Sequence, residues 1–111
     1  MDDFVVKENE KIELTKVDGD LEVKDGAVIN IPAEVEYLVV NGDLNCDGDI
    51  VIKGSISANN VFHRDGDLEI TGNVKTKELT VESRAFRNGP LLIIGGSLEC
   101  EEASIDGSLE V

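Results

Sequence analysis

Apolar and polar positions alternate within a short phrase that begins with glycine and recurs along the chain. The phrase reads G-x-[aliphatic]-x-[aliphatic or small], and the copies at Gly42, Gly48 and Gly54 follow one another at every sixth position. Apolar residues at every second position indicate strands, because an α-helix repeats every 3.6 residues. The pattern therefore predicts units of one short strand and one turn, the turn being made by Gly, Asp or Asn. Further copies begin at Gly19, Gly66, Gly72, Gly96 and Gly107.

Three such units would make one turn of a coil, which we call a rung. Gly48 and Gly66 lie three units apart, and aligning them places Ile50 over Leu68. A single rung cannot bury its own apolar side chains, whereas stacked rungs bury them in columns of like residues. We therefore expect an all-β fold, a single three-sided β-solenoid (β-helix) with about 18 residues per rung and short insertions.

A longer repeat competes with this period. The spacings between Gly19, Gly42, Gly66 and Gly89 are all close to four units, as a wider rung would require. We favour the rung of three units with insertions of about one unit, such as 84–89, because the residue classes then align better. On the third side, the alignment places Val61 and His63 over Leu79 and Val81, then over Ala103 and Ile105.

The chain is expected to be one domain of 111 residues. Within it, 38–111 carries the regular units and 1–37 the irregular first rungs. Apolar and polar positions alternate only loosely in residues 1–16, and this pattern predicts a first strand or a hairpin. Pro32 predicts a corner, because proline interrupts strand ladders.

The charge of the chain excludes two classes of partner. Ten Lys and Arg residues stand against 24 Asp and Glu, for a net charge of −14. Phosphate binding needs basic residues, so nucleic acid and anionic membrane surfaces are not expected partners. No apolar run reaches the roughly 18 residues of a membrane span. The start of the chain lacks the features of a secretory signal. Two cysteines are too few for a disulfide framework and fit a reducing compartment. We expect a cytoplasmic protein.

The stacked phrases resemble the bactofilins, a family of polymer-forming bacterial cytoskeletal proteins, over residues 38–111. The resemblance rests on the G-x-[LIV]-x-[IVA] phrases and on the segments KELTVES and EEASIDGSLEV. It implies a right-handed, three-sided β-helix that joins end to end into non-polar filaments without a nucleotide.

The residue types of catalysis and metal binding are sparse. His63 is the only histidine, fewer than the three that a zinc hydratase built on such a fold needs. We expect it to point inward or to lie at a corner, with one hydrogen bond. The D-G-D triplets around Gly19, Gly48 and Gly66 suit turns better than the known calcium loops. We expect Cys46 and Cys100 to be buried free thiols. The sequence therefore predicts no catalytic, cofactor or metal site and no enzyme.

Two surfaces are candidates for protein contacts. The first is an assembly interface between the two ends of the solenoid, formed by Phe4, Val5, Val6, Leu109 and Val111. The second is a lateral contact near the insertion, where cations and an aromatic residue precede a run that is apolar on both faces. Its members are Arg84, Phe86, Arg87, Leu91, Leu92, Ile93 and Ile94.

Two functions are consistent with these features. One is a non-enzymatic structural protein that self-assembles end to end into filaments or a scaffold, as in the bactofilins. The other is an acidic monomeric module that binds or inhibits another protein, of the immunity or polyanion-mimic type. The repetitive phrase at Gly107 favours the first, and the charge of −14 favours the second.

Overall fold

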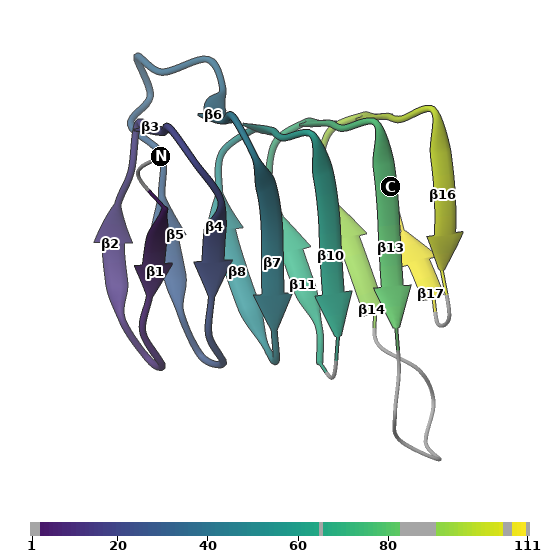
Figure 1. Cartoon of the computed structure of the whole chain (residues 1–111), viewed down its shortest axis with the longest axis horizontal. Coiled ribbons are helices and arrows are strands. Elements are labelled where there is room, and N and C mark those ends of the chain that lie inside the picture. Colours follow the sequence, from purple (N-terminus) through teal and green to yellow (C-terminus); the bar gives the residue numbers. More distant parts are fainter. Residues whose placement is uncertain (1–2, 65, 83–90, 106–107, 111) are drawn as a thin grey trace.

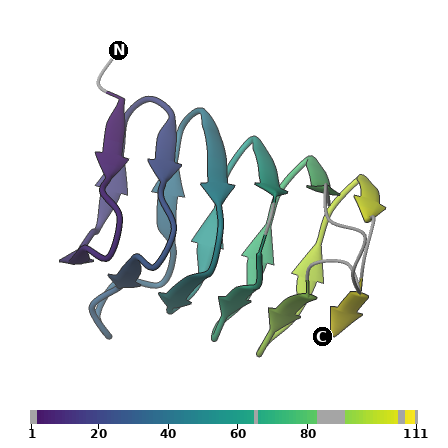
Figure 2. The same cartoon turned by 90° about the horizontal axis from the view of Figure 1, so that it is seen from below.

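The computed structural model describes residues 3–64, 66–82, 91–105 and 108–110. Only the main chain is described for Leu91, Ile105 and 108–110. These residues form 17 short strands and no helix. The molecule measures 38 × 29 × 25 Å, with successive rungs stacked along the longest axis (Figure 2).

The strands lie in three parallel sheets, and each rung contributes one strand to each sheet in turn. Sheet A contains β1 (Phe4–Val6), β4 (Leu21–Val23), β7 (Asp43–Asp47), β10 (Asn60–Arg64), β13 (Glu78–Glu82) and β16 (Glu102–Ile105). Sheet B contains β2 (Lys11–Glu13), β5 (Val28–Asn30), β8 (Ile50–Lys53), β11 (Leu68–Ile70), β14 (Leu91–Ile94) and β17 (Ser108–Glu110). Sheet C contains β3 (Lys16–Val17), β6 (Leu38–Val40), β9 (Ile56–Ser57), β12 (Val74–Lys75) and β15 (Leu98–Glu99).

The coil is right-handed. In Figure 1 the strands β7 and β10 run downward at the front, β8 and β11 run upward behind them, and the chain advances from left to right. The three-sided, all-β solenoid predicted from the sequence is confirmed.

The register confirms a rung of three six-residue units with insertions. Ile52 pairs with Ile70, three units later, and Val61 pairs with Leu79 at the same separation. Leu79 pairs with Ala103, four units later, across a rung that contains the connection 83–90. The step from Leu21 to Leu44 is longer than three units as well, and it spans the connection between β5 and β6. Two insertions therefore lengthen individual rungs in a coil of three units per rung. The spacing from Gly42 to Gly66 has another origin, because Gly42 stacks on Gly19 and Gly66 on Gly48, at different corners of the coil.

The first rungs follow the same plan. Strand β1 pairs with β4 in sheet A, and β2 pairs with β5 in sheet B. Residues 4–13 thus supply two strands to two sheets, and the alternative of a hairpin over residues 1–16 is wrong. The tight turn between β1 and β2, where Asn9 has φ of 58°, turns the chain from one side of the coil to the next.

The core consists of columns of aliphatic side chains, one from each rung. The sheet B column of Ile29, Ile52 and Ile70 is at most 1% exposed. Burying one such side chain contributes roughly 1.5–3 kcal/mol. Because the columns need residues of similar size at every rung, they explain the repeated aliphatic pair of the phrase.

Glycine begins the phrase because adjacent rungs touch through their main chains at the corners. The N–H of Gly72 donates to the carbonyl oxygen of Gly54, and that of Gly96 to Gly72, each at 2.8 Å. A Cβ on Gly72 would lie 2.6 Å from the carbonyl carbon and oxygen of Gly54. Gly54 itself has φ of 142°, in the region that favours glycine.

The second residue of the phrase is polar because its side chain caps the next rung. Asp20 Oδ1 accepts the N–H of Asp43 at 2.8 Å, and Asp49 Oδ1 accepts the N–H of Asp67 at 2.8 Å. At another corner Ser55 Oγ accepts the N–H of Asn73. These stacked hydrogen bonds, which we call corner ladders, give the aspartates of the D-G-D triplets a structural role.

Candidate functional site

The first rung leaves part of its apolar layer open. Phe4 and Ile12 are only half-buried, although Leu21 and Ile29, their partners in the next rung, are fully buried. Beside them Val5 points outward from sheet A and is 47% exposed. Val6 is fully buried, so the structure removes it from the predicted assembly surface. Phe4, Val5 and Ile12 form what we call the head face.

The opposite end shows the same loss of burial. Leu98 pairs with buried Val74, yet it is only half-buried itself. Ala103 pairs with buried Leu79, yet it is exposed. Both residues occupy inward places, and we call the surface around them the tail face. The predicted interface also includes Leu109 and Val111. Only the main chain of Leu109 is described, and Val111 lies outside the described residues.

The predicted lateral contact is only partly tested by the described residues. Leu92 and Ile94 are 0% and 2% exposed and belong to the core, so the structure removes them from that surface. Ile93 faces outward between them and is half-buried. Arg84, Phe86 and Arg87, and the side chain of Leu91, lie outside the described part of the chain.

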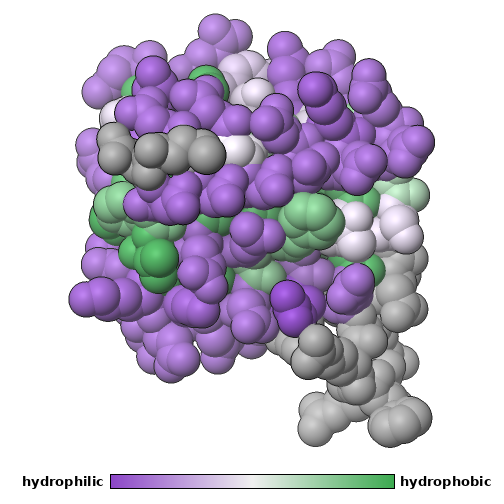
Figure 3. Space-filling model, in the orientation of Figure 1, coloured by the Kyte–Doolittle hydropathy of each residue, from purple (hydrophilic) through white to green (hydrophobic). Residues whose placement is uncertain are grey.

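Ile93 borders a shallow apolar groove on the outer face of sheet B. The groove runs past Val28, Val51 and Ile93, with Glu69 between the last two. Figure 3 shows a band of apolar surface that runs across the outer face of sheet A, with hydrophilic surface on either side of it. Val5 and Phe62 are the large apolar residues of sheet A that are exposed among those described.

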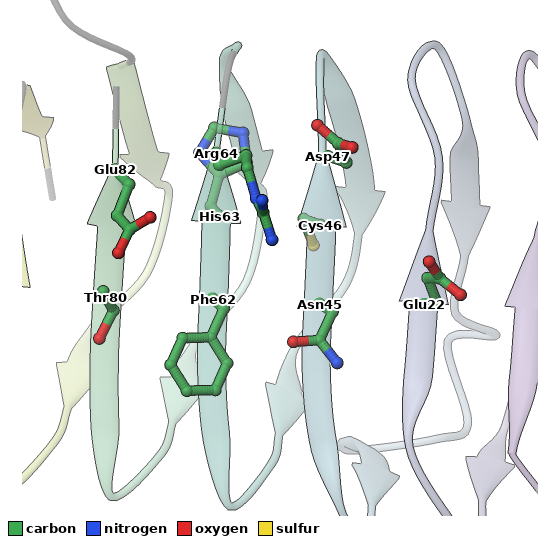
Figure 4. A pocket seen from close by; sticks show the side chains of 9 residues that line it. All are labelled: Glu22, Asn45, Cys46, Asp47, Phe62, His63, Arg64, Thr80 and Glu82. Atoms are coloured by element: carbon green, nitrogen blue, oxygen red, sulfur yellow. The ribbon is translucent and has the colours of Figure 1, made fainter. Parts of the chain in front are cut away.

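Phe62 is one of nine residues that line a hollow of about 190 Å³ on sheet A (Figure 4). Asn45 and Thr80 flank Phe62 on the neighbouring strands, and Arg64 follows it along β10. Carboxylates supply the rest of the polar lining, from Glu22, Asp47 and Glu82. The arrangement offers one aromatic face and several hydrogen-bonding groups to a ligand.

The two residue types most suited to catalysis face away from this hollow. His63 and Cys46 border it through their main chains, because their side chains are 1% and 4% exposed and point into the core. His63 Nε2 donates to the carbonyl oxygen of Gly48 at 2.9 Å, which confirms the inward histidine with one hydrogen bond. Burial raises the pKa of the Cys46 thiol, which keeps it protonated. Cys100 is only half-buried, which corrects the expectation that both thiols are buried.

Some surface features were not singled out from the sequence. Phe62 is 36% exposed, and its place between inward Val61 and His63 would have predicted its outward direction. Lys75 Nζ lies 5.2 Å from the centre of the Tyr37 ring, a cation–π contact between β12 and the connection after β5. That contact joins residues two rungs apart along the chain, so no local pattern could have shown it.

No protein-family model, curated protein or solved structure matches the chain. Within the described residues, no helix is long and apolar enough to cross a membrane. Among the same residues, no three His, Cys, Asp or Glu side chains gather where they could hold a metal ion.

Proposed function

We propose that this chain is a non-enzymatic structural protein that self-assembles end to end into filaments or a scaffold, as the resemblance to the bactofilins implies. The observation that carries the proposal is a partial loss of burial at both ends of the columns. Phe4 and Ile12 on the head face and Leu98 and Ala103 on the tail face hold inward places that are buried in neighbouring rungs. A second copy stacked on either face would bury them.

The main chain of the first strand supports the same proposal. The N–H of Phe4 donates to Asp20, and the carbonyl of Val6 accepts from Lys24, so both residues direct their main-chain groups toward β4. Main-chain groups alternate in direction along a strand, so those of Val5 point away from β4. An open strand edge of this kind is a template for pairing with another chain.

The net charge of −14 opposes the association of identical chains at low ionic strength. Salt screens exposed charges beyond about 10 Å at 0.1 M. Assembly is therefore expected to increase as salt rises, the reverse of a contact held mainly by ion pairs.

The test compares light scattering and negative-stain electron microscopy for three proteins across salt concentrations. The unmodified chain is expected to polymerise at high salt, and Phe4→Glu to stay a folded monomer, because it places a charge on the head face. Phe62→Glu is the matched control, since it makes the same change on the side of the solenoid. Circular dichroism checks that both variants are folded.

An unmodified chain that stays monomeric at high concentration in both low and high salt would defeat the proposal. The acidic binding module would then be the better interpretation. Equal loss of assembly in Phe4→Glu and Phe62→Glu would defeat the end-to-end geometry.

A further inference from the structure

The charged residues are distributed unevenly over the three sides of the solenoid. On sheet A, the outward positions of the strands hold Glu22, Asp43, Asp47, Glu78, Glu82, Glu102 and, as their one basic residue, Arg64. Among the described side chains, the outside of sheet B holds Lys11, Lys53, Glu13 and Glu69, and the outside of sheet C holds Lys16, Lys75 and Glu99. The outer face of sheet A, which we call the acidic side, therefore carries most of the unbalanced charge of the strands.

Phe62 lies in the middle of the acidic side. Among the large apolar residues that are exposed in the described chain, it is the one aromatic residue. In the register of the sheet, Phe62 pairs with Asn45 on one side and with Thr80 on the other, and Glu22 lies beyond Asn45. The ring is thus exposed between polar side chains on both neighbouring strands (Figure 4).

A second row of charged residues lies beside this ring. Arg64 pairs in register with Asp47 and with Glu82, two positions further along the same three strands. Within the described part of the chain, none of these three side chains forms an ion pair, whereas Glu22 pairs with Lys24 at 2.7 Å. The carboxylates of Asp47 and Glu82 are therefore free to interact with a cation from another molecule.

The hollow that Phe62 lines is the size of a side chain. Its volume of about 190 Å³ is below the roughly 300–1,000 Å³ of pockets that hold a whole small-molecule ligand. A lysine or arginine side chain is attracted to the face of an aromatic ring within about 6 Å of its centre. Carboxylates around the ring add a complementary potential, which favours a basic partner over a neutral or acidic one.

We propose that the acidic side binds a basic segment of another protein, with one lysine or arginine side chain of that segment in the hollow against Phe62. The site lies on middle rungs and on the side of the solenoid, so it stays open in a monomer and in an end-to-end filament alike. The inference therefore goes beyond self-assembly and does not depend on it. A second copy of this chain is a poor occupant, because its own net charge is −14.

Fluorescence anisotropy with a labelled peptide of alternating lysine and glycine tests the site at 0.15 M salt. The same peptide with acetylated lysines is the control probe, and we expect it not to bind because it has lost its charge. Phe62→Ala should weaken binding of the lysine peptide roughly two- to fivefold, the size of an exposed cation–π contact. Val39→Ala truncates an exposed apolar residue on sheet C and should leave binding unchanged. Equal binding of both peptides, or equal effects of the two variants, would overturn the proposal.

A second pair of variants separates a local site from attraction to the net charge. Arg64→Gln should strengthen binding of the lysine peptide, by roughly up to fivefold, because it removes the cation between Asp47 and Glu82. Lys53→Gln makes the same change in net charge on the outside of sheet B. Salt at 0.15 M screens exposed charges beyond about 8 Å, so Lys53→Gln should have a much smaller effect. Equal strengthening by both variants would show a non-specific attraction and overturn the proposal.

Light scattering on the same samples keeps this inference apart from the proposed function. A chain that stays monomeric at every salt concentration, yet binds the peptide with these differences, supports the site while self-assembly fails. A chain that polymerises but does not bind the peptide loses the site alone. Loss of polymers in Phe62→Ala, with the fold retained by circular dichroism, would make the acidic side a contact between copies and would also overturn the proposal.

Discussion

The imidazole of His63 is hydrogen-bonded to the corner of the preceding rung, where Nε2 donates to the carbonyl oxygen of Gly48 at 2.9 Å. The ring occupies an inward place between Cys46 and Val81 on the adjacent strands and is 1% exposed. Its Nδ1 has no hydrogen-bond partner among the described residues. A polar ring thus stands in a column that is otherwise filled by small apolar side chains.

Replacing this histidine should weaken the fold modestly. His63→Val fits the column but leaves the carbonyl of Gly48 without its partner, which costs about 1–3 kcal/mol, and the loss of the unpartnered Nδ1 offsets part of this. We expect urea denaturation to show a net loss of about 1 kcal/mol. A variant as stable as the unmodified protein would contradict this net loss.

A charge placed in a core column should unfold the protein. Ile70 and Val74 are each 1% exposed, on either side of the corner at Gly72, so Ile70→Asp or Val74→Asp would bury a carboxylate without a partner. Lys75→Asp is the control, because it places the same side chain on the exposed neighbour of Val74. Circular dichroism should show loss of strand structure in the first two alone. Retention of the original melting temperature in either core variant would contradict the register.

A methyl group at a corner should also be costly. A Cβ on Gly72 would overlap the main chain of Gly54, which cannot move without breaking the 2.8 Å hydrogen bond between the two residues. Overpacking of this kind typically costs about 1–3 kcal/mol. We expect Gly72→Ala to lower the free energy of unfolding by that amount in urea. An unchanged midpoint would mean that the corners separate more easily than the stacked glycines indicate.

Alkaline pH should reveal the buried thiol. Burial raises the pKa of Cys46 above its unfolded value of about 8.5, so the unfolded chain releases this proton first as pH rises. The stability that depends on the protonated thiol is fully present below about pH 8.5 and is lost above it, by up to about 1.4 kcal/mol per pH unit. Cys46→Val should lack this loss. Urea denaturation of both proteins between pH 7 and 9.5 measures the difference, and parallel curves would contradict it.

The repeated phrase determined the strand positions, the inward residues and the alignment of rungs, because alternation within a strand is a local property of the sequence. Ile50 therefore pairs with Leu68 and Ile56 with Val74, as the aligned phrases predict. The turns at the glycines were also predicted, because a repeat of six positions leaves little room between strands. The close contact between the main chains of stacked glycines was not predicted.

Tertiary structure decided what depends on contacts between distant rungs. Both insertions coincide with the wider glycine spacings, and only the strand pairing showed that they extend a coil of three units per rung. The burial of Val6, Leu92 and Ile94 and the exposure of Ala103 depend on which rungs lie above and below them. The partners in the corner ladders are likewise invisible in the sequence, because an aspartate can cap either neighbouring rung and only the stacked main chains determine which N–H it meets.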